Sequence, residues 1–143
     1  MSLVVVDANV AAKWFLPEDR EALVSEALAL LDKYDREEVQ FVVPDLFYVE
    51  TASAIWKAVR AGRVSRAFGD QALDLLTQRE FPTVPSLKFL DSAFEIATAY
   101  GRTVYDSLYV ALAMQSNAQL ITADERLANS LAARFPVKWL GAI

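Results

Sequence analysis

The sequence predicts an α/β fold in which helices cover both faces of a parallel sheet. Short runs rich in β-branched residues recur along the chain, and segments with apolar residues at helical spacing separate them. Strands that alternate with helices are typical of parallel sheets. With 143 residues, 55% of them hydrophobic, the chain can build one substantial core but not two, so residues 1–143 are predicted to form a single domain.

Five segments have the length and composition of buried strands. Their predicted ranges are Leu3–Val6, Gln40–Val43, Thr83–Pro85, Ala118–Thr122 and Val137–Leu140. In an open α/β sheet, the ligand crevice lies beyond the carboxyl ends of the strands, where the strand order reverses. Functional side chains are therefore expected just after these strands.

The segments between the strands are predicted to be helical. Their ranges are Ala8–Phe15, Asp19–Tyr34, Asp45–Ala61, Ser65–Arg79, Ser86–Tyr100, Asp106–Ser116 and Asp124–Arg134. Asp45 and Ser65 are expected to cap the N-termini of their helices. Gly62 and Gly101 follow two predicted helix ends, where glycine accepts a left-handed backbone.

The composition excludes several classes of enzyme and of location. The chain has no histidine and no cysteine, which excludes Ser-His-Asp triads, Cys-His nucleophiles, disulfides and zinc sites built on these residues. No apolar run is long enough to span a membrane, and the start lacks the pattern of a signal peptide, so we expect a cytoplasmic protein with no membrane partner. The net charge of −5 does not indicate a broadly basic nucleic-acid surface, but it leaves room for a local basic strip.

Four acids are expected to meet at the crevice. Asp7 directly follows the first strand, and Asp124 stands two residues after Thr122, which ends the fourth. Glu50 and Asp106 have mostly apolar neighbours one helical turn away, so both are expected to face inward. Two carboxylates about 5 Å apart repel by roughly 3 kcal/mol at an effective dielectric of about 20, so such a cluster needs protons or a cation. An all-oxygen set suits Mg²⁺ or Mn²⁺.

Ordinary structural roles compete with this interpretation. Asp7, Asp106 and Asp124 each stand where a helix cap is plausible, whereas Glu50 needs a partner, which Lys57 could supply. Four cations are candidates for gripping phosphates, although each can equally be a solvated surface charge. They are Lys13, Arg60, Arg63 and Arg102.

Four segments together resemble the PIN-domain ribonucleases, and among these most closely the VapC-type toxins of prokaryotic toxin–antitoxin pairs. They are 4-VVVDANVAAKWFLPED-19, 44-PDLFYVETASAIWKA-58, 104-VYDSLYVALA-113 and 120-LITADERLA-128. The resemblance covers essentially the whole chain. It implies a PIN-like three-layer α/β/α sandwich with a central parallel sheet of about five strands.

The resemblance also implies a function: endonucleolytic cleavage of RNA that depends on Mg²⁺ or Mn²⁺ and leaves a 5′-phosphate and a 3′-hydroxyl. Asp7, Glu50, Asp106 and Asp124 match the acidic quartet of the family, with Asp7 and Asp106 as direct metal ligands. Glu50 and Asp124 would bind metal through water, hold a second ion or orient the attacking water. Thr122 matches the hydroxyl residue before the fourth acid. The implied partners are a small antitoxin and a second copy of the chain.

Asn9 departs from the family pattern, because a small hydroxyl residue often stands there. It and Thr122 are the candidates for supporting the four acids. Four alternatives remain open from the sequence. These are a stand-alone PIN nuclease of RNA processing, a flap-type nuclease acting on DNA, a binding protein without turnover, and a receiver-like phospho-acceptor module. The last is disfavoured because a single acid follows the first strand and Lys138 lies within the last.

Overall fold

The computed structural model describes residues 2–143, and its centre is a five-stranded sheet in which every pair of neighbouring strands is parallel. The strands are β1 (Ser2–Val6), β2 (Val39–Pro44), β3 (Thr83–Val84), β4 (Gln119–Thr122) and β5 (Val137–Trp139). Their order across the sheet is β3-β2-β1-β4-β5. The predicted parallel sheet of about five strands is confirmed.

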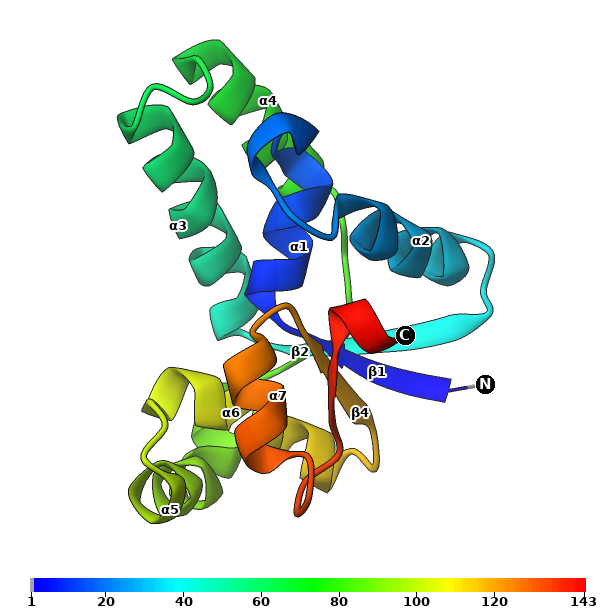
Figure 1. Ribbon diagram of the computed structural model, residues 1–143, viewed down its shortest axis with the longest axis vertical. Coiled ribbons are helices and arrows are strands. Elements are labelled where there is room, and N and C mark those ends of the chain that lie inside the picture. The colour runs from blue at the N-terminus through cyan, green and yellow to red at the C-terminus, as the bar shows by residue number, and fades with distance from the viewer. Residues whose placement is uncertain (1) are drawn as a thin grey trace.

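Helices cover both faces of this sheet (Figure 1). They are α1 (Ala8–Phe15), α2 (Val24–Asp35), α3 (Leu46–Arg60), α4 (Arg66–Thr77), α5 (Leu90–Tyr100), α6 (Val104–Gln115) and α7 (Glu125–Leu131). Helices α1 to α4 lie on one side of the sheet and α5 to α7 on the other, which completes the three layers. Each crossover is then right-handed, as the twist of the strands favours.

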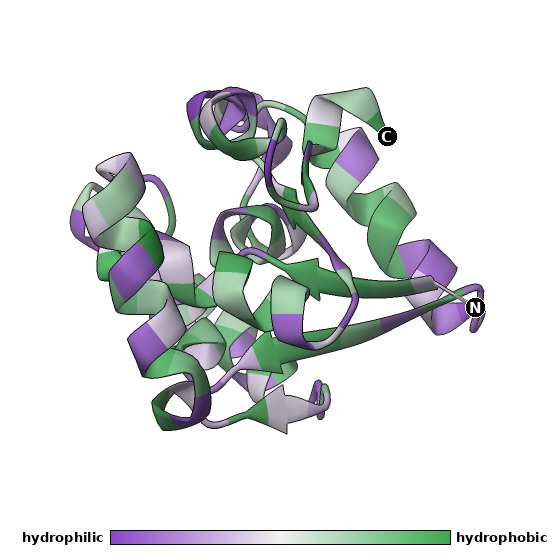
Figure 2. Cartoon of the chain, turned by 90° about the horizontal axis from the view of Figure 1, so that it is seen from below, coloured by the Kyte–Doolittle hydropathy of each residue, from purple (hydrophilic) through white to green (hydrophobic). Residues whose placement is uncertain are grey.

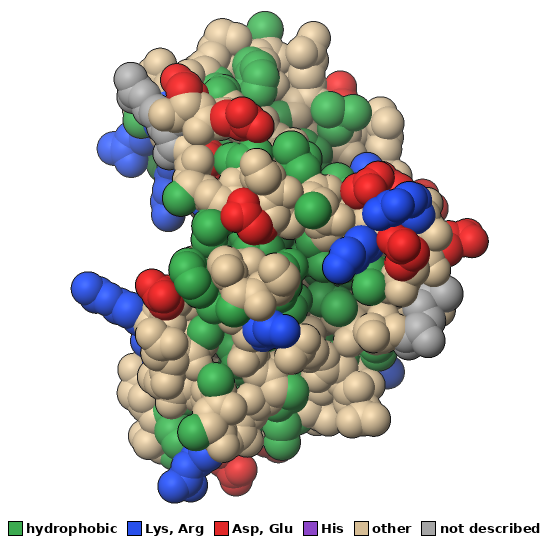
Figure 3. Space-filling view, turned by 45° about the vertical axis from the view of Figure 1, so that its right-hand side comes forward, with side chains coloured by type: hydrophobic (Ala, Val, Ile, Leu, Met, Phe, Trp, Pro, Cys, Tyr) green, Lys and Arg blue, Asp and Glu red, His purple; other side chains and the backbone are tan. Residues whose placement is uncertain are grey.

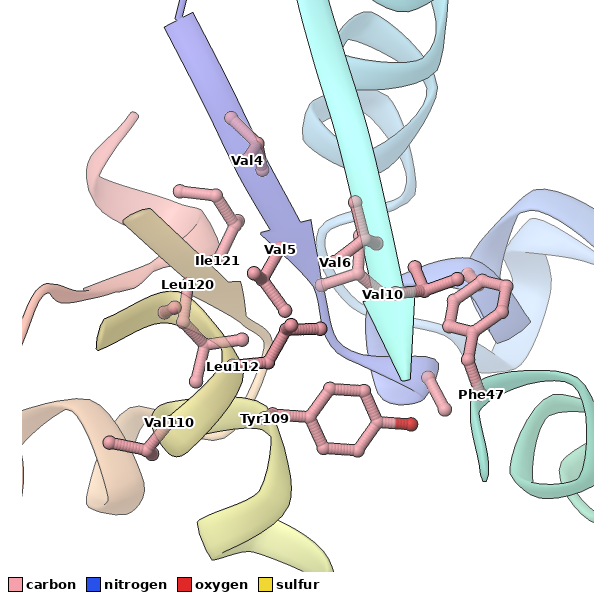
Figure 4. Packing of buried hydrophobic residues seen from close by; sticks show 14 of the residues in the cluster. Val4, Val5, Val6, Val10, Phe47, Tyr109, Val110, Leu112, Leu120 and Ile121 are labelled. Atoms are coloured by element: carbon pink, nitrogen blue, oxygen red, sulfur yellow. The ribbon is translucent and has the colours of Figure 1, made fainter. Parts of the chain in front are cut away.

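The apolar core fills the space between the layers. The end of β1 is fully enclosed, with Val5 and Val6 at 0% exposure, and α6 packs against it through Leu112. In Figure 2 the central strands are hydrophobic along much of their length, as expected for strands buried on both faces. Figure 4 shows side chains of β1, β4 and α6 meeting in one cluster. Within the described residues, no helix is both long and apolar enough to cross a membrane.

The predicted start of α2 and the predicted cap of α3 are wrong. The helix predicted over Asp19–Tyr34 begins only at Val24, because Leu23 has a left-handed backbone (φ 61°) and Glu21 is extended. Asp45 does not cap α3: its backbone is already helical, and its Oδ1 accepts hydrogen bonds from the amide and the hydroxyl of Ser86. The cap predicted at Ser65 is confirmed, since its hydroxyl accepts from the amide of Phe68.

The start of α6 bears directly on the site. This helix begins at Val104, two residues before the predicted start, and Thr103 is its N-cap. The hydroxyl of Thr103 accepts from the amide of Asp106 at 3.0 Å. Asp106 therefore does not cap the helix, and its carboxylate remains available for other contacts. Asp7 and Asp124 do cap α1 and α7, by accepting from the amides of Asn9 and Leu127.

Candidate active site

The strand order places a crevice where β1 and β4 end. Both strands lie next to each other, but the chain leaves them toward opposite faces of the sheet, so this is the point where the strand order reverses. The amide of Asp7 donates to the carbonyl of Ile121 at 3.1 Å, which ties the two strand ends together. Asp7 and Asp124 follow these ends as predicted. Glu50 enters from α3 and Asp106 from α6.

Asp7 is the most enclosed of the four acids, with 6% of its surface exposed. Its pKa is raised to about 7, chiefly by burial; the charges of Asp106 and Glu50 contribute to the rise, while hydrogen bonds from Thr122 and Asn9 oppose it. The mutual effects show that these three acids share one environment. Asp7 consequently carries a proton over much of the acidic and neutral range unless a cation compensates its charge.

Thr122 and Asn9 hold this carboxylate in place. Thr122 is completely buried, and its hydroxyl donates to Oδ2 of Asp7 at 2.9 Å. The hydroxyl oxygen of Thr122 also accepts from Nδ2 of Asn9 at 3.2 Å and from the amide of Asp124 at 3.1 Å. Oδ1 of Asn9 in turn accepts from the amide of Ala123. One threonine hydroxyl thus connects the first acid, the fourth acid and Asn9, and all its hydrogen-bonding capacity is used.

Glu50 is half-buried and is bound by Tyr109, whose hydroxyl donates to Oε1 at 2.6 Å. Burial raises the pKa of Glu50, and Asp106 adds to this, while the hydrogen bond from Tyr109 and the charge of Lys57 lower it. Burial also raises the pKa of Tyr109, so its hydroxyl stays a donor. In Figure 4 this hydroxyl points out of the apolar cluster. Tyr109 anchors Glu50, the role that the sequence had left to Lys57.

Arg102 joins the two remaining acids. Its Nη2 lies 3.3 Å from Oδ2 of Asp106 and 3.3 Å from Oδ2 of Asp124. Arg102 stands in the loop between α5 and α6, and its side chain is 22% exposed. The four predicted acids therefore form an inner pair, Asp7 and Glu50, held by neutral donors, and an outer pair held by one guanidinium.

The donor set has the chemistry that a hard divalent cation requires, because every candidate ligand is a carboxylate oxygen. The raised pKa values of Asp7 and Glu50 record charges that lack compensation. Over residues 2–143, however, no three acidic side chains converge closely enough to ligate one ion as they stand. Asp106 and Asp124 are turned to Arg102, and Glu50 is turned to Tyr109. Ligation of a metal would require some of these contacts to be exchanged.

Comparison with known proteins places the chain in a family. The PIN domain family matches residues 4–130. The chain belongs to the PIN-domain family. Ribonuclease VapC3 of Pyrobaculum aerophilum is 30% identical over 132 residues, which cover 91% of this chain and 95% of that protein. Membership in this family leaves the receiver-like alternative without support.

Solved structures share the fold of this PIN domain. The crystal structure of PAE2754 from Pyrobaculum aerophilum superimposes with a TM-score of 0.69 at 23% identity, covering 99% of this chain and 85% of the other. A chain of a toxin–antitoxin complex from Klebsiella pneumoniae gives a TM-score of 0.59 at 17% identity, with 94% and 95% covered. At these identities the likeness concerns the fold.

A groove of about 500 Å³ lies between α1 and α3 of this PIN domain, and of the four acids Asp124 lines it. Its lining includes Asn9, Lys13, Glu21, Lys57, Arg63 and Asp124, with small side chains such as Ala54 and Ala58 between them. Glu21 pairs with both Lys13, at 3.4 Å, and Arg63, at 3.1 Å. Two of the predicted phosphate-binding cations thus stand in the groove, whereas Arg60 lies over the ring of Trp56. On the face shown in Figure 3, acidic and basic side chains alternate with exposed apolar ones.

Three site residues of this PIN domain were missed or misjudged from the sequence. Tyr109 lies within the helix predicted over Asp106–Ser116 and was given no role in the site; the signal that could have found it is its hydroxyl, which needs a hydrogen-bond partner when buried. Arg102 was considered only for phosphates, although its spacing of four residues from Asp106 indicates an ion pair. Glu21 was assigned to a helix, and no local signal identifies its link to Arg63, which lies 42 residues away.

Proposed function

We propose that this PIN domain is a metal-dependent endoribonuclease that acts as the toxin of a toxin–antitoxin pair. The observation that supports the proposal most strongly is that the charge of Asp106 raises the pKa of both Asp7 and Glu50, which places three acidic side chains near one another at the β1–β4 crevice. The names of its relatives support it, since VapC3 and VapC9 are both named ribonucleases. The proposed substrate also favours a cytoplasmic location.

The residues that would hold Mg²⁺ or Mn²⁺ are Asp7 and Asp106 as direct ligands, with Glu50 and Asp124 acting through water or on a second ion. A bound ion would lower the pKa of a water molecule and polarise the scissile phosphate, which provides hydrolysis without histidine. Thr122 fixes Oδ2 of Asp7 and therefore the direction in which the carboxylate faces the crevice. Tyr109 does the same for Glu50.

The groove supports a polymeric substrate. Lys13, Lys57 and Arg63 line it next to Asn9 and Asp124, so a phosphate backbone could leave the acids along a path with positive charge. Because Glu21 fixes Lys13 and Arg63, these cations are already oriented when the substrate arrives. This local strip is compatible with the overall charge of −5.

Three further features belong to the proposal. Residues 1–143 form one domain, which the single large core spanning both faces of the sheet supports. A small antitoxin is the expected protein partner, because structures of similar fold include toxin–antitoxin complexes from Klebsiella pneumoniae and Rickettsia felis. A homodimer is expected as well, and the exposed apolar side chains Leu87 and Phe94, at 81% and 60% exposure, offer a surface for it.

The test of the chemistry is cleavage of total RNA by the purified chain with Mg²⁺, with Mn²⁺ and with EDTA. We expect cleavage only with a divalent ion, and its loss in Asp7→Asn and Asp106→Asn. Asp91→Asn is the matched control, because Asp91 is an exposed acid in the first turn of α5, away from the crevice. Undiminished cleavage in EDTA would refute the metal-dependent mechanism.

The test of the biological role is expression in a host cell. A toxin should arrest growth, and the arrest should disappear in Asp7→Asn and on co-expression of a DNA-binding antitoxin encoded by the neighbouring gene. Metal-dependent RNA cleavage without growth arrest would instead identify a stand-alone nuclease of RNA processing. End-mapping of the products would then show which RNA is cut.

A further inference from the structure

Arg102 holds a position among the acids that the proposed chemistry does not use. One nitrogen, Nη2, lies 3.3 Å from a carboxylate oxygen of Asp106 and 3.3 Å from one of Asp124. These acids stand on different elements, 18 positions apart in sequence. Among the described residues, their side chains form no hydrogen bond or ion pair with each other. The guanidinium is thus the bridge that brings the outer pair together.

The position of Arg102 is set by its local structure. Gly101, with φ 69°, ends α5 in a left-handed turn, and α6 begins at Val104. The side chain is 22% exposed, and its Nε is buried without a hydrogen-bond partner. A buried donor without a partner is unfavourable, so this nitrogen contributes nothing to holding the side chain. The ion pairs with Asp106 and Asp124 therefore determine where the guanidinium stays.

The other nearby cations are engaged differently. Lys13 and Arg63 pair with Glu21, and Lys57 affects Glu50 only through its charge. Among the side chains that the structure describes, Arg102 is the cation that forms ion pairs with members of the acidic quartet. A charge of +1 already compensates the same oxygens that a divalent ion would need.

We propose that Arg102 is an internal counter-ion that competes with the divalent cation for Asp106 and Asp124. The inference rests on the proposed metal-dependent function and concerns the regulation of that site. Without a metal ion, Arg102 reduces the repulsion among the acids and holds the outer pair in one arrangement. Binding of a divalent ion to Asp106 requires that the guanidinium release this oxygen, since two cations at the same oxygen repel each other.

Removing the charge of Arg102 is expected to strengthen metal binding, for two reasons. Removing the charge of Arg102 leaves the acids more strongly repelled when no metal is bound, which destabilises that state. The bound state loses an unfavourable contact between two cations. Both effects strengthen metal binding. A charge of +1 that must leave the ligand oxygens weakens binding by about tenfold when screening at this partly exposed site is included.

The experiment is calorimetric titration of Mn²⁺ into the full chain, with Arg102→Gln, Arg102→Lys and Arg66→Gln beside the wild type. Arg102→Gln should bind Mn²⁺ about tenfold more tightly, and its melting temperature should fall in EDTA but rise more steeply when Mn²⁺ is added. Arg102→Lys keeps the charge and should bind within about threefold of the wild type. Arg66→Gln is the matched control, because it removes an exposed pair to Asp70 on α4, and it should leave Mn²⁺ affinity unchanged.

A second measurement follows the displacement in the wild type itself and uses a variant only to assign one signal. In the ¹⁵N-labelled wild type, the Nε–H signal of Arg102, assigned by its absence in Arg102→Lys, should move or broaden when Mg²⁺ is added. A signal that neither moves nor broadens at saturating Mg²⁺ would contradict the displacement of the guanidinium.

The outcomes separate this proposal from the proposed function. If the wild type binds Mn²⁺ and cuts RNA, equal or weaker binding by folded Arg102→Gln overturns the competition alone and leaves the nuclease intact. If neither protein binds Mn²⁺ and the wild type does not cut RNA, both proposals fail. Binding that appears only in Arg102→Gln supports the competition in its strongest form.

Discussion

Replacing Asp7 by asparagine should stabilise the fold in a way that depends on pH. Asp7 is 6% exposed and accepts hydrogen bonds from Thr122 and from the amide of Asn9; asparagine can accept the bond from Thr122 through its amide oxygen and loses the other at every pH. The substitution therefore removes a charge while it keeps the shape and the contact with Thr122. Its effect reports how unfavourable the ionised carboxylate is in the crevice.

The size of the effect follows from the pKa of Asp7, which rises from 3.8 to about 7 in the fold. Because the pKa is raised in the fold, the contribution of protonated Asp7 to the free energy of unfolding is fully present below pH 3.8 and is lost as the pH rises to about 7. Ionisation then destabilises the fold by about 4 kcal/mol at pH 8 and by about 2 kcal/mol at pH 5. Asp7→Asn should therefore gain about 2 to 3 kcal/mol more at pH 8 than at pH 5, whatever its pH-independent effect.

The assay is urea unfolding of the wild type and of Asp7→Asn in EDTA at pH 5, 6, 7 and 8. Asp91→Asn is the control, because it removes one exposed acid of the same type and should give the same difference at every pH. Metal must be excluded, since a bound ion compensates the charge of Asp7 and would cancel the gain.

A constant difference between Asp7→Asn and the wild type from pH 5 to pH 8 would refute the reasoning. It would mean that the carboxylate of Asp7 is ionised in the fold without penalty, and that the mutual repulsion with Asp106 and Glu50 is absent. The proposed need for a divalent cation would then lose its energetic basis.

Three other substitutions test the supports of the site. Thr122→Val keeps the shape but removes a buried hydroxyl that makes three hydrogen bonds, so urea unfolding should show a loss of about 1–3 kcal/mol. Tyr109→Phe removes the hydrogen bond that lowers the pKa of Glu50. The acid limb of the pH profile of RNA cleavage should therefore shift to higher pH. Leu112→Ala leaves a cavity under β1 at a position 1% exposed, and should cost about 2–5 kcal/mol of unfolding free energy.

Much of the fold could be predicted because the strands and helices have simple local signals. The β-branched run before Asp7 fixes β1, and glycines with a left-handed backbone stop α3 and α5 where expected. The wrong helix start at Asp19 has a tertiary cause: Glu21 is extended and pairs with Lys13 and Arg63. Helix propensity alone predicts that the helix includes residues 19–23, because no local sequence pattern indicates that Glu21 forms ion pairs with other elements.

The positions of the four acids in the fold could be predicted from the sequence, but their contacts could not. Asp7 and Asp124 follow strand ends, and Glu50 interrupts an apolar stripe, so periodicity alone selects them. The contacts between these side chains could not be predicted, because the hydrogen bond between Tyr109 and Glu50 joins residues 59 positions apart. The start of α6 could not be predicted precisely either. Because Thr103 caps this helix, the side chain of Asp106 is not its cap, and the sequence alone had left both roles of Asp106 open.

The division of the acids into two pairs indicates where a cation is most needed. Arg102 compensates the outer pair, whereas Asp7 and Glu50 have only neutral donors, and the raised pKa values fall on these two. Asp7 cannot relieve its burial by moving, because Val5 and Val6 before it are fully enclosed and Thr122 holds its carboxylate from β4. Asp7 is therefore protonated over much of the acidic and neutral range unless an external cation compensates its charge. Rigid placement of uncompensated carboxylates is what a metal-dependent site requires.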